Sequence, residues 1–250
     1  MHAAGAPSSY ILVNLAAIVA GFLAARLLKR SSAHKLHVAG ICTIAVALAL
    51  LGIALAGPRV NGASRWFRIA GISLQPSLML LPPAMVVFAG NRYWLSSIGL
   101  MLAGVALALQ PDRAMAGTLA AGLAVLRVCR SDVSVTVSLA VASCAFAVTL
   151  AASDHVPPAP FVEHVVHSAF AFNPLAGLGI VVGLAMMLVP AVIGVVTQTH
   201  DVAKFAVFGA TWLTVIAFAV AGNYPTPLVG YGASGILGYG LSAALLTDRH

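Results

Sequence analysis

Long runs of apolar residues, separated by short polar stretches, dominate this sequence. A helix needs about 20 mostly apolar residues to span a bilayer, and runs such as 37–57 and 133–152 have that length. Only 8% of the 250 residues are charged, against roughly 25% in a soluble domain. Because so few charges cannot cover a water-facing surface, we predict an all-α integral membrane protein with residues 1–250 in one transmembrane domain.

The apolar runs predict a polytopic bundle of about nine transmembrane helices. We expect these helices at residues 10–28, 37–57, 77–90, 95–109, 114–128, 133–152, 167–196, 205–221 and 228–246. Proline removes a backbone donor and clashes with the preceding turn of a helix. We therefore expect Pro174 and Pro190 to break the seventh helix, and Pro82 with Pro83 to kink the third.

Basic residues are distributed unevenly between the two predicted membrane faces. One face receives most of the 13 Lys and Arg residues, namely Arg26, Lys29, Arg30, Lys35, Arg92, Arg127, Arg130, Lys204 and Arg249. Basic loops stay in the cytoplasm, so we expect the N-terminus outside and the C-terminus in the cytoplasm. The N-terminus has neither a basic region nor a cleavage site, so we expect no removable signal peptide.

The net charge of +7 does not indicate nucleic-acid binding, because the basic residues lie at segment ends and form no run with interleaved aromatics. Cys42, Cys129 and Cys144 lie within or beside apolar segments and show no paired spacing. This placement favours packing over a disulfide or a metal site.

The most polar and basic interval, residues 59–77, falls on the predicted outer face. It holds Arg59, Arg65 and Arg68, and Arg113 falls on the same face. These four depart from the positive-inside pattern, and a planar guanidinium binds phosphate oxygens bidentately. They therefore form a candidate clamp for a pyrophosphate or a sugar carrier. The alternative is that they anchor the loop among lipid headgroups and pair with Asp112.

Three motifs on the predicted outer face resemble one family. Gly62-Ala63-Ser64-Arg65-Trp66-Phe67 with Gln75-Pro76-Ser77 is similar to Gly-Ala-Arg-Arg-Trp-Ile with Gln-Pro-Ser-Glu. Gln110-Pro111-Asp112 with Gly117-Thr118 is similar to Gln-Pro-Asp-Leu-Gly-Thr, and residues 227–234 to Pro-Phe-Ile-Ser-Tyr-Gly-Gly-Ser. These are signatures of the SEDS family of RodA- and FtsW-like cell-wall glycosyltransferases, and the resemblance covers about residues 37–246.

The resemblance implies a bundle that handles lipid-linked disaccharide at its outer face. The family has ten crossings, so nine imply that this chain lacks the family's first helix. The catalytic aspartate proposed for the family lies in a long outer loop, and the corresponding interval here is only about 14 residues, with Asp154 its one aspartate. Leu78 and Leu81 replace the family's Glu and Lys, and Asn173-Pro174 its Glu-Glu pair. Glu163-His164 is out of register with the family's acidic motif.

The candidate site residues follow from these motifs. For substrate binding we expect Arg65, Trp66, Arg68, Gln75, Ser77, Gln110, Tyr231 and Ser234. The catalytic candidates are Asp154 and Asp112, and the alternative for Asp112 is a structural ion pair with Arg113, Arg65 or Arg68. The glycines around Tyr231 favour close helix packing over a ligand contact.

Glu163, His164 and His167 are weak metal candidates, because Glu163 and His167 are four residues apart, as neighbours on one helical face are. The alternative is a plain loop surface or a partner contact. We expect no cofactor, with a divalent metal only if the chain is an active enzyme.

The resemblance implies a SEDS-like protein of the bacterial inner membrane in cell-envelope or cell-wall biogenesis, in cell shape or cell division, and the departures from the family motifs favour a non-catalytic or degenerate member. Its expected partners are a membrane lipid or polyprenyl-linked saccharide, or another membrane protein, and no nucleic acid. One alternative is an active minimal glycosyltransferase of the peptidoglycan type. A second is a structural accessory subunit of a larger membrane complex. A transporter ranks lower, since no paired broken helices occur in two halves.

Overall fold

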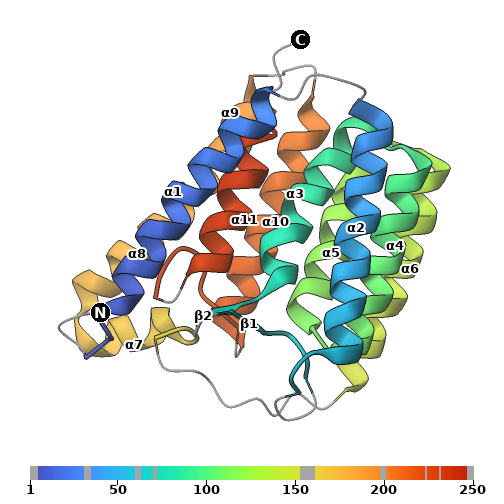
Figure 1. The fold of residues 1–250 in the computed structure, drawn as a ribbon. Coiled ribbons are helices and arrows are strands. Elements are labelled where there is room, and N and C mark those ends of the chain that lie inside the picture. Colours follow the sequence, from blue (N-terminus) through green and yellow to red (C-terminus); the bar gives the residue numbers. More distant parts are fainter. Residues whose placement is uncertain are drawn as a thin grey trace.

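The computed structural model describes residues 5–30, 35–59, 63–69, 72–152, 161–197, 201–222, 224–230 and 232–246. In this part of the chain the helices are α1 (Ser9–Arg30), α2 (Lys35–Ala56), α3 (Pro76–Asn91), α4 (Trp94–Leu109), α5 (Arg113–Cys129), α6 (Val133–Ala151), α7 (Val165–Phe172), α8 (Pro174–Met186), α9 (Val189–Val196), α10 (Val202–Ala221) and α11 (Ala233–Ala244). Each of the nine predicted segments is helical, and the helices stand side by side in one bundle (Figure 1).

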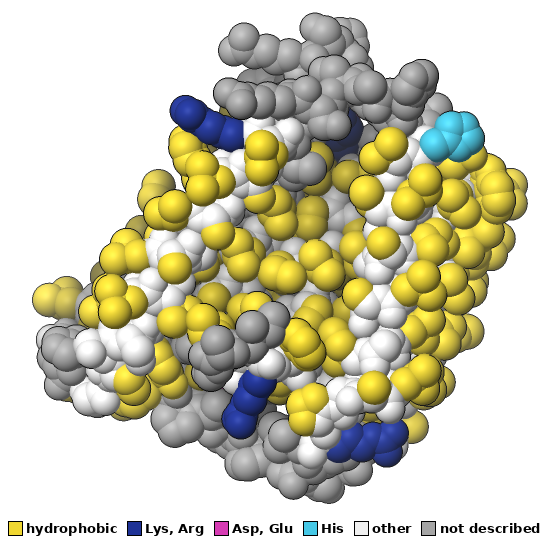
Figure 2. All heavy atoms as spheres, in the orientation of Figure 1, with side chains coloured by type: hydrophobic (Ala, Val, Ile, Leu, Met, Phe, Trp, Pro, Cys, Tyr) yellow, Lys and Arg dark blue, Asp and Glu magenta, His cyan; other side chains and the backbone are white. Residues whose placement is uncertain are grey.

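The composition and length of the helices confirm a multi-pass membrane protein. In the described residues, spans long and apolar enough to cross a bilayer are Ser9–Leu27, His37–Ala56, Val133–Ala151, Pro174–Val196 and Val202–Ala221, while α3 and α4 are shorter apolar helices. Large apolar side chains lie on the outside, as expected for a surface in lipid. Figure 2 shows this apolar surface, with basic side chains only near its two ends.

The seventh predicted helix is broken where the prolines predict. Asn173 ends α7 and caps α8, since its side-chain oxygen accepts a hydrogen bond from the Leu175 N–H at 2.8 Å. Pro174 is the first residue of α8, where its missing donor costs nothing. Residues 187–188 then interrupt the helix before Pro190 lies in the first turn of α9. In contrast, α3 continues through Pro82 and Pro83 as one helix.

The core lies around α3, which packs against α2, α5, α10 and α11. Phe88 of α3, Phe208 and Trp212 of α10 and Leu119 of α5 are fully buried there. Gly238 brings α11 against the α3 backbone, because a Cβ at that position would overlap the Leu78 carbonyl oxygen. Small residues of this kind allow the close helix packing that membrane bundles depend on.

A short antiparallel hairpin is the one departure from the all-α prediction in the described residues. Strand β1 (Phe67–Ile69) pairs with β2 (Ile72–Leu74), with Arg68 opposite Ser73. Aromatic and β-branched residues on both sides of a Gly favour such a turn, so the signal was present in the sequence. The hairpin and the start of α1 lie at one end of the bundle, which we call the hairpin end (Figure 1).

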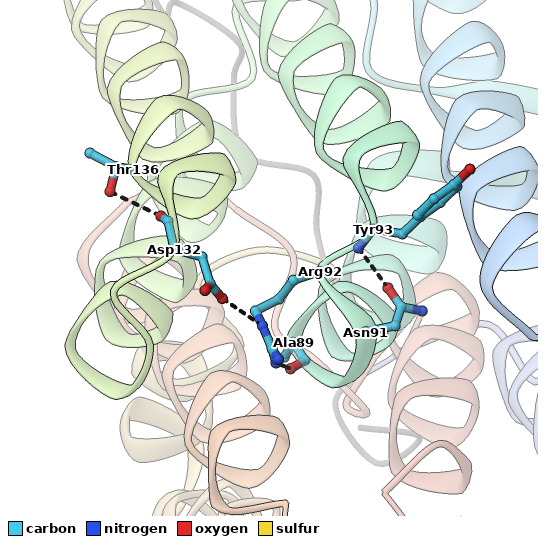
Figure 3. Close-up of polar contacts among 6 residues, drawn as sticks. All are labelled: Ala89, Asn91, Arg92, Tyr93, Asp132 and Thr136. Carbon is cyan, nitrogen blue, oxygen red and sulfur yellow. Dashed lines mark hydrogen bonds and ion pairs between the residues drawn. The ribbon is translucent and has the colours of Figure 1, made fainter.

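At the opposite end, exposed polar contacts join the helix turns. Arg92, between α3 and α4, forms an ion pair with Asp132 at the start of α6, with Nε and Oδ2 2.6 Å apart. Figure 3 shows Arg92 directed at Asp132, and the Asn91 side chain accepting from the Tyr93 N–H. The Tyr93 hydroxyl also lies 3.1 Å from His37 Nδ1 of α2. These contacts fix the turns at the protein surface.

Candidate functional site

The three sequence motifs come together at the hairpin end. The chain enters β1 through Ser64 and Arg65, leaves β2 directly into Gln75 and α3, and returns at the α4–α5 turn with Gln110 and Asp112. Residues 224–232 then lead into α11, whose second residue is Ser234. Segments that are distant in sequence therefore meet at one place. We call the polar residues that they bring there the polar cluster: Ser64, Arg65, Gln75, Ser77, Gln110, Asp112, Thr226 and Ser234.

Asp112 is the centre of this cluster and is completely buried. Its Oδ2 accepts hydrogen bonds from Gln75 Nε2 at 3.0 Å and from Ser77 Oγ at 2.8 Å. Its Oδ1 accepts the Met115 N–H at 3.3 Å and so caps α5. The predicted ion pair with an arginine is wrong for the described residues, because amide, hydroxyl and backbone donors solvate this carboxylate instead.

Arg65 lies beside Asp112 and is also buried, with 5% of its surface exposed. Its Nη2 donates to the Pro111 carbonyl oxygen at 2.6 Å, and its guanidinium lies 5.1 Å from the centre of the Tyr224 ring. The cation over the aromatic face and the bond to the α4–α5 turn hold the chain before β1 against the loop before α11. Arg65 therefore contributes to the architecture of the cluster.

Further hydrogen bonds connect the cluster to the neighbouring elements. Gln110 Nε2 donates to the Leu50 carbonyl oxygen of α2 at 2.6 Å. The Gln75 N–H donates to Ser234 Oγ at 2.8 Å, which joins the start of α3 to the start of α11. The Thr226 N–H donates to the Val162 carbonyl oxygen at 2.9 Å.

Three buried side-chain oxygens around Arg65 have no hydrogen-bond partner in the described part of the chain: Ser64 Oγ, Gln75 Oε1 and Thr226 Oγ1. Ser64 precedes Arg65, Thr226 is two residues beyond Tyr224, and the Gln75 amide is bound to Asp112. A buried polar atom without a partner costs free energy. Each of these oxygens is therefore a position where a ligand hydroxyl or a water molecule would stabilise the site.

The other arginines at this end differ in their surroundings. Arg113 is directed at the C-terminus of α6, where it donates to the Ala152 carbonyl oxygen at 3.1 Å and to that of Thr149 at 3.3 Å. It thereby satisfies carbonyls that the helix leaves unpaired. Arg68 is exposed and donates to Ser73 Oγ across the hairpin at 3.3 Å. Trp66 is half-buried beside it.

Several predicted site residues do not join the polar cluster. Asp154 and Tyr231 lie outside the described residues. The expected shared helical face of Glu163 and His167 is wrong, because α7 begins only at Val165; Glu163 is buried in the preceding turn and His167 is exposed. His164 and His167 pack ring against ring with centroids 5.7 Å apart. Among the described residues, no three His, Cys, Asp or Glu side chains form a group that could hold a metal ion.

Comparison with solved structures identifies the architecture. The chain matches the crystal structure of the rod shape determining protein RodA from Thermus thermophilus with a TM-score of 0.61 and 21% identity, over 96% of this chain and 86% of that one. The chain has the RodA fold. A point mutant of the same RodA matches with a TM-score of 0.60 at the same identity, over 96% of this chain and 87% of the mutant. No family model and no curated protein matches the chain.

The RodA-like fold confirms the predicted resemblance at the level of architecture. Four residues with contacts at this end of the bundle were not among the predicted site residues: Tyr224, Ser64, Thr226 and Asn14 of α1. Asn14 had a usable signal, because it is the one amide in the first apolar run and polar groups at membrane depth are costly. Tyr224 had none, since its contact with Arg65 joins residues that are far apart in sequence.

Proposed function

We propose that this chain is a SEDS-like protein of cell-envelope biogenesis in the bacterial inner membrane, with the hairpin end facing outward and the C-terminus in the cytoplasm. In this proposal the polar cluster binds a polyprenyl-linked glycan and does not polymerise it. The observation that carries the proposal is the group of three buried oxygens around Arg65 that have no hydrogen-bond partner among the described residues, at the end of a RodA-like bundle where the motifs meet.

The charge balance at the hairpin end supports an anionic ligand. The described residues there include Arg59, Arg65, Arg68 and Arg113 but only two acidic groups, Asp112 and Glu163. Arg59 and Arg68 are exposed and so accessible to a pyrophosphate, and the half-buried Trp66 offers an apolar face to a sugar ring or an isoprenoid. Ser64, Gln75 and Thr226 supply the hydrogen-bonding atoms that a saccharide requires.

The proposal that the chain does not polymerise the glycan rests on the surroundings of Asp112 and on the two leucines that replace charged residues of the SEDS signature. A catalytic carboxylate must reach the reacting atoms, whereas Asp112 is fully buried and accepts three hydrogen bonds. Leu78 and Leu81, which stand where the SEDS signature has Glu and Lys, are buried in the apolar core. These surroundings favour a cluster that holds a ligand over one that acts on it chemically.

Binding of a labelled polyprenyl pyrophosphate disaccharide to the protein in lipid nanodiscs tests this function. We expect saturable binding that Arg68→Gln weakens and Gln75→Glu abolishes, because the new carboxylate would face Asp112 and the anionic ligand. Arg92→Gln at the opposite end is the matched control and should bind as the native protein does. Equal binding by all four proteins, or none by the native protein, would contradict the proposal.

The same preparation distinguishes the two alternatives. Formation of glycan polymer that disappears in Asp154→Asn would establish a minimal glycosyltransferase in place of a binding protein. Co-purification of another membrane protein without any lipid-linked saccharide would favour an accessory subunit. A partner of this kind would have an apolar face available on α8, of whose 13 residues only Gly177 and Leu184 are buried.

A further inference from the structure

Helix α1 is attached to the bundle more loosely than the other long helices. Only 11% of its apolar span is buried, against 44% for α10. It packs chiefly against α11, through a small hydrophobic cluster of Ala17, Ala233 and Ile236 that is separate from the main core. Helix α1 ends, and α2 begins, at the end of the bundle opposite the hairpin. From there the two helices diverge towards the hairpin end (Figure 1).

The side-chain amide of Asn14 joins the half of α1 near the hairpin end to the loop before α11. Asn14 Nδ2 donates to the Gly230 carbonyl oxygen at 2.7 Å, and Asn14 Oδ1 accepts the Gly232 N–H at 3.1 Å. Both halves of the amide are therefore used on one short loop, whose Gly230 has a φ of 77° that favours glycine. We call this pair of bonds the Asn14 clasp.

The loop held by the clasp also carries contacts of the polar cluster. Its first residue, Tyr224, lies under the Arg65 guanidinium, and Thr226 bonds to Val162. Immediately after the loop, Ser234 accepts the Gln75 N–H. The position of α1 is thus connected to the polar cluster through a few residues of backbone.

An apolar groove of about 430 Å³ lies beside the clasp. Its walls include Val13 and Ala17 of α1, Leu74 of β2 and Leu237 of α11. Val13 directly precedes Asn14, Ala17 lies about one helical turn beyond it, and Leu74 directly precedes Gln75 of the polar cluster. The face drawn in Figure 2 is hollowed between α1 and α2, with apolar side chains on its walls. Movement of α1 as a whole away from α11 and β2 would widen the groove and stretch the Asn14 clasp.

We propose that α1 is a lateral gate and that the Asn14 clasp is its latch, so that a lipid with a long hydrocarbon chain enters the groove from the bilayer and brings its polar head to the cluster. Hydrogen bonds between membrane helices are weak enough to open and close reversibly. Opening of the latch frees the loop that positions Tyr224 and Ser234, which couples entry to the site. The nature of the entering lipid rests on the function proposed above; the latch itself does not.

The latch is tested with Asn14→Leu, which keeps the side-chain volume and removes both hydrogen bonds. Leu15→Ala is the matched control, because Leu15 is the next residue and is exposed on the surface. By hydrogen exchange in phosphatidylethanolamine–phosphatidylglycerol nanodiscs, Asn14→Leu should speed exchange across residues 224–232 by about fivefold to tenfold, the combined factor expected when two of the weak hydrogen bonds found between membrane segments are lost. Unchanged exchange, or an equal effect of Leu15→Ala, would overturn the latch. Asn14→Ser serves the same test if the leucine variant does not fold.

Movement of the gate is measured as the distance between spin labels at Leu15 of α1 and Leu48 of α2, both of which are exposed on the surface. The labels are attached to introduced cysteines after Cys42, Cys129 and Cys144 have been replaced by alanine. Asn14→Leu should broaden the distance distribution towards longer values, and a polyprenyl phosphate should shift the native protein in the same direction. A polyprenyl phosphate that binds without moving α1 overturns the gate and leaves the binding site intact. If it does not bind while Asn14→Leu still broadens the distribution, the latch stands and the proposed function fails.

Discussion

The two ends of the bundle use polar residues in different ways. At the hairpin end, Asp112, Gln75 and Ser77 are almost entirely buried and connect elements that are 35 or more residues apart in sequence. At the opposite end, Arg92 and Asp132 form an ion pair with 26% and 48% of their side chains exposed. The first arrangement organises the interior of the fold, and the second joins turns at the surface.

From this difference we expect that a short charge–charge distance is a poor guide to how much a contact stabilises this molecule. The ion pair at the opposite end is the closer contact, yet water and lipid headgroups would replace it at little cost. The buried polar cluster at the hairpin end has no such alternative, because each hydrogen bond lost there leaves a buried group without a partner. The substitutions below test this ranking, from the largest expected effect to the smallest.

Asp112→Ala should have the largest effect on stability. It would leave the Gln75 amide and the Ser77 hydroxyl buried without an acceptor and uncap α5, which costs about 3 kcal/mol or more. The midpoint of thermal unfolding in detergent, followed by fluorescence-detected gel filtration, measures the loss. Asp132→Ala removes an aspartate from the other end and should shift the midpoint far less; equal shifts would contradict the comparison.

Arg65→Ala should be the next most damaging change, at about 2 kcal/mol, because it removes the bond to the Pro111 carbonyl and the contact with the Tyr224 ring. The matched control is Arg68→Ala, which removes an exposed arginine from the same hairpin. Thermal unfolding compares the two variants directly. A smaller effect at Arg65 than at Arg68 would show that burial does not determine the ranking.

Arg113→Ala should have a moderate effect of about 1 kcal/mol, since it removes a cation from the C-terminus of α6. Hydrogen exchange should rise in the last turn of α6 and remain unchanged in the first turn. Exchange that rises along the whole of α6 would mean that Arg113 supports the helix as a unit.

Arg92→Ala should have the smallest effect, below about 1 kcal/mol, because the pair with Asp132 is exposed. Its effect should shrink further when the ionic strength is raised from about 0.05 M to about 0.5 M. The Debye length then falls from about 14 Å to about 4 Å, so the ion pair is screened more strongly. A large loss that does not depend on salt would place Arg92 with the buried residues of the hairpin end.

The sequence predicted the membrane class, the nine helical segments and the meeting of the three motifs at one end, because these depend on apolar length and on the alternation of membrane faces. It did not predict the partners of Asp112. An aspartate beside an arginine suggested an ion pair, whereas the turn of the chain directs Arg113 to the carbonyls of α6 and leaves Asp112 to Gln75 and Ser77. Such pairings depend on tertiary packing, which local patterns do not encode.

The central claim is that the polar cluster at the hairpin end holds a lipid-linked saccharide. Native mass spectrometry of the protein, extracted gently from its own membrane, tests it most directly. We predict a retained mass that fits a polyprenyl pyrophosphate saccharide in the native protein and in Arg92→Ala, and its loss in Arg65→Ala. A protein that retains no such mass, or retains it equally in Arg65→Ala, would contradict the claim.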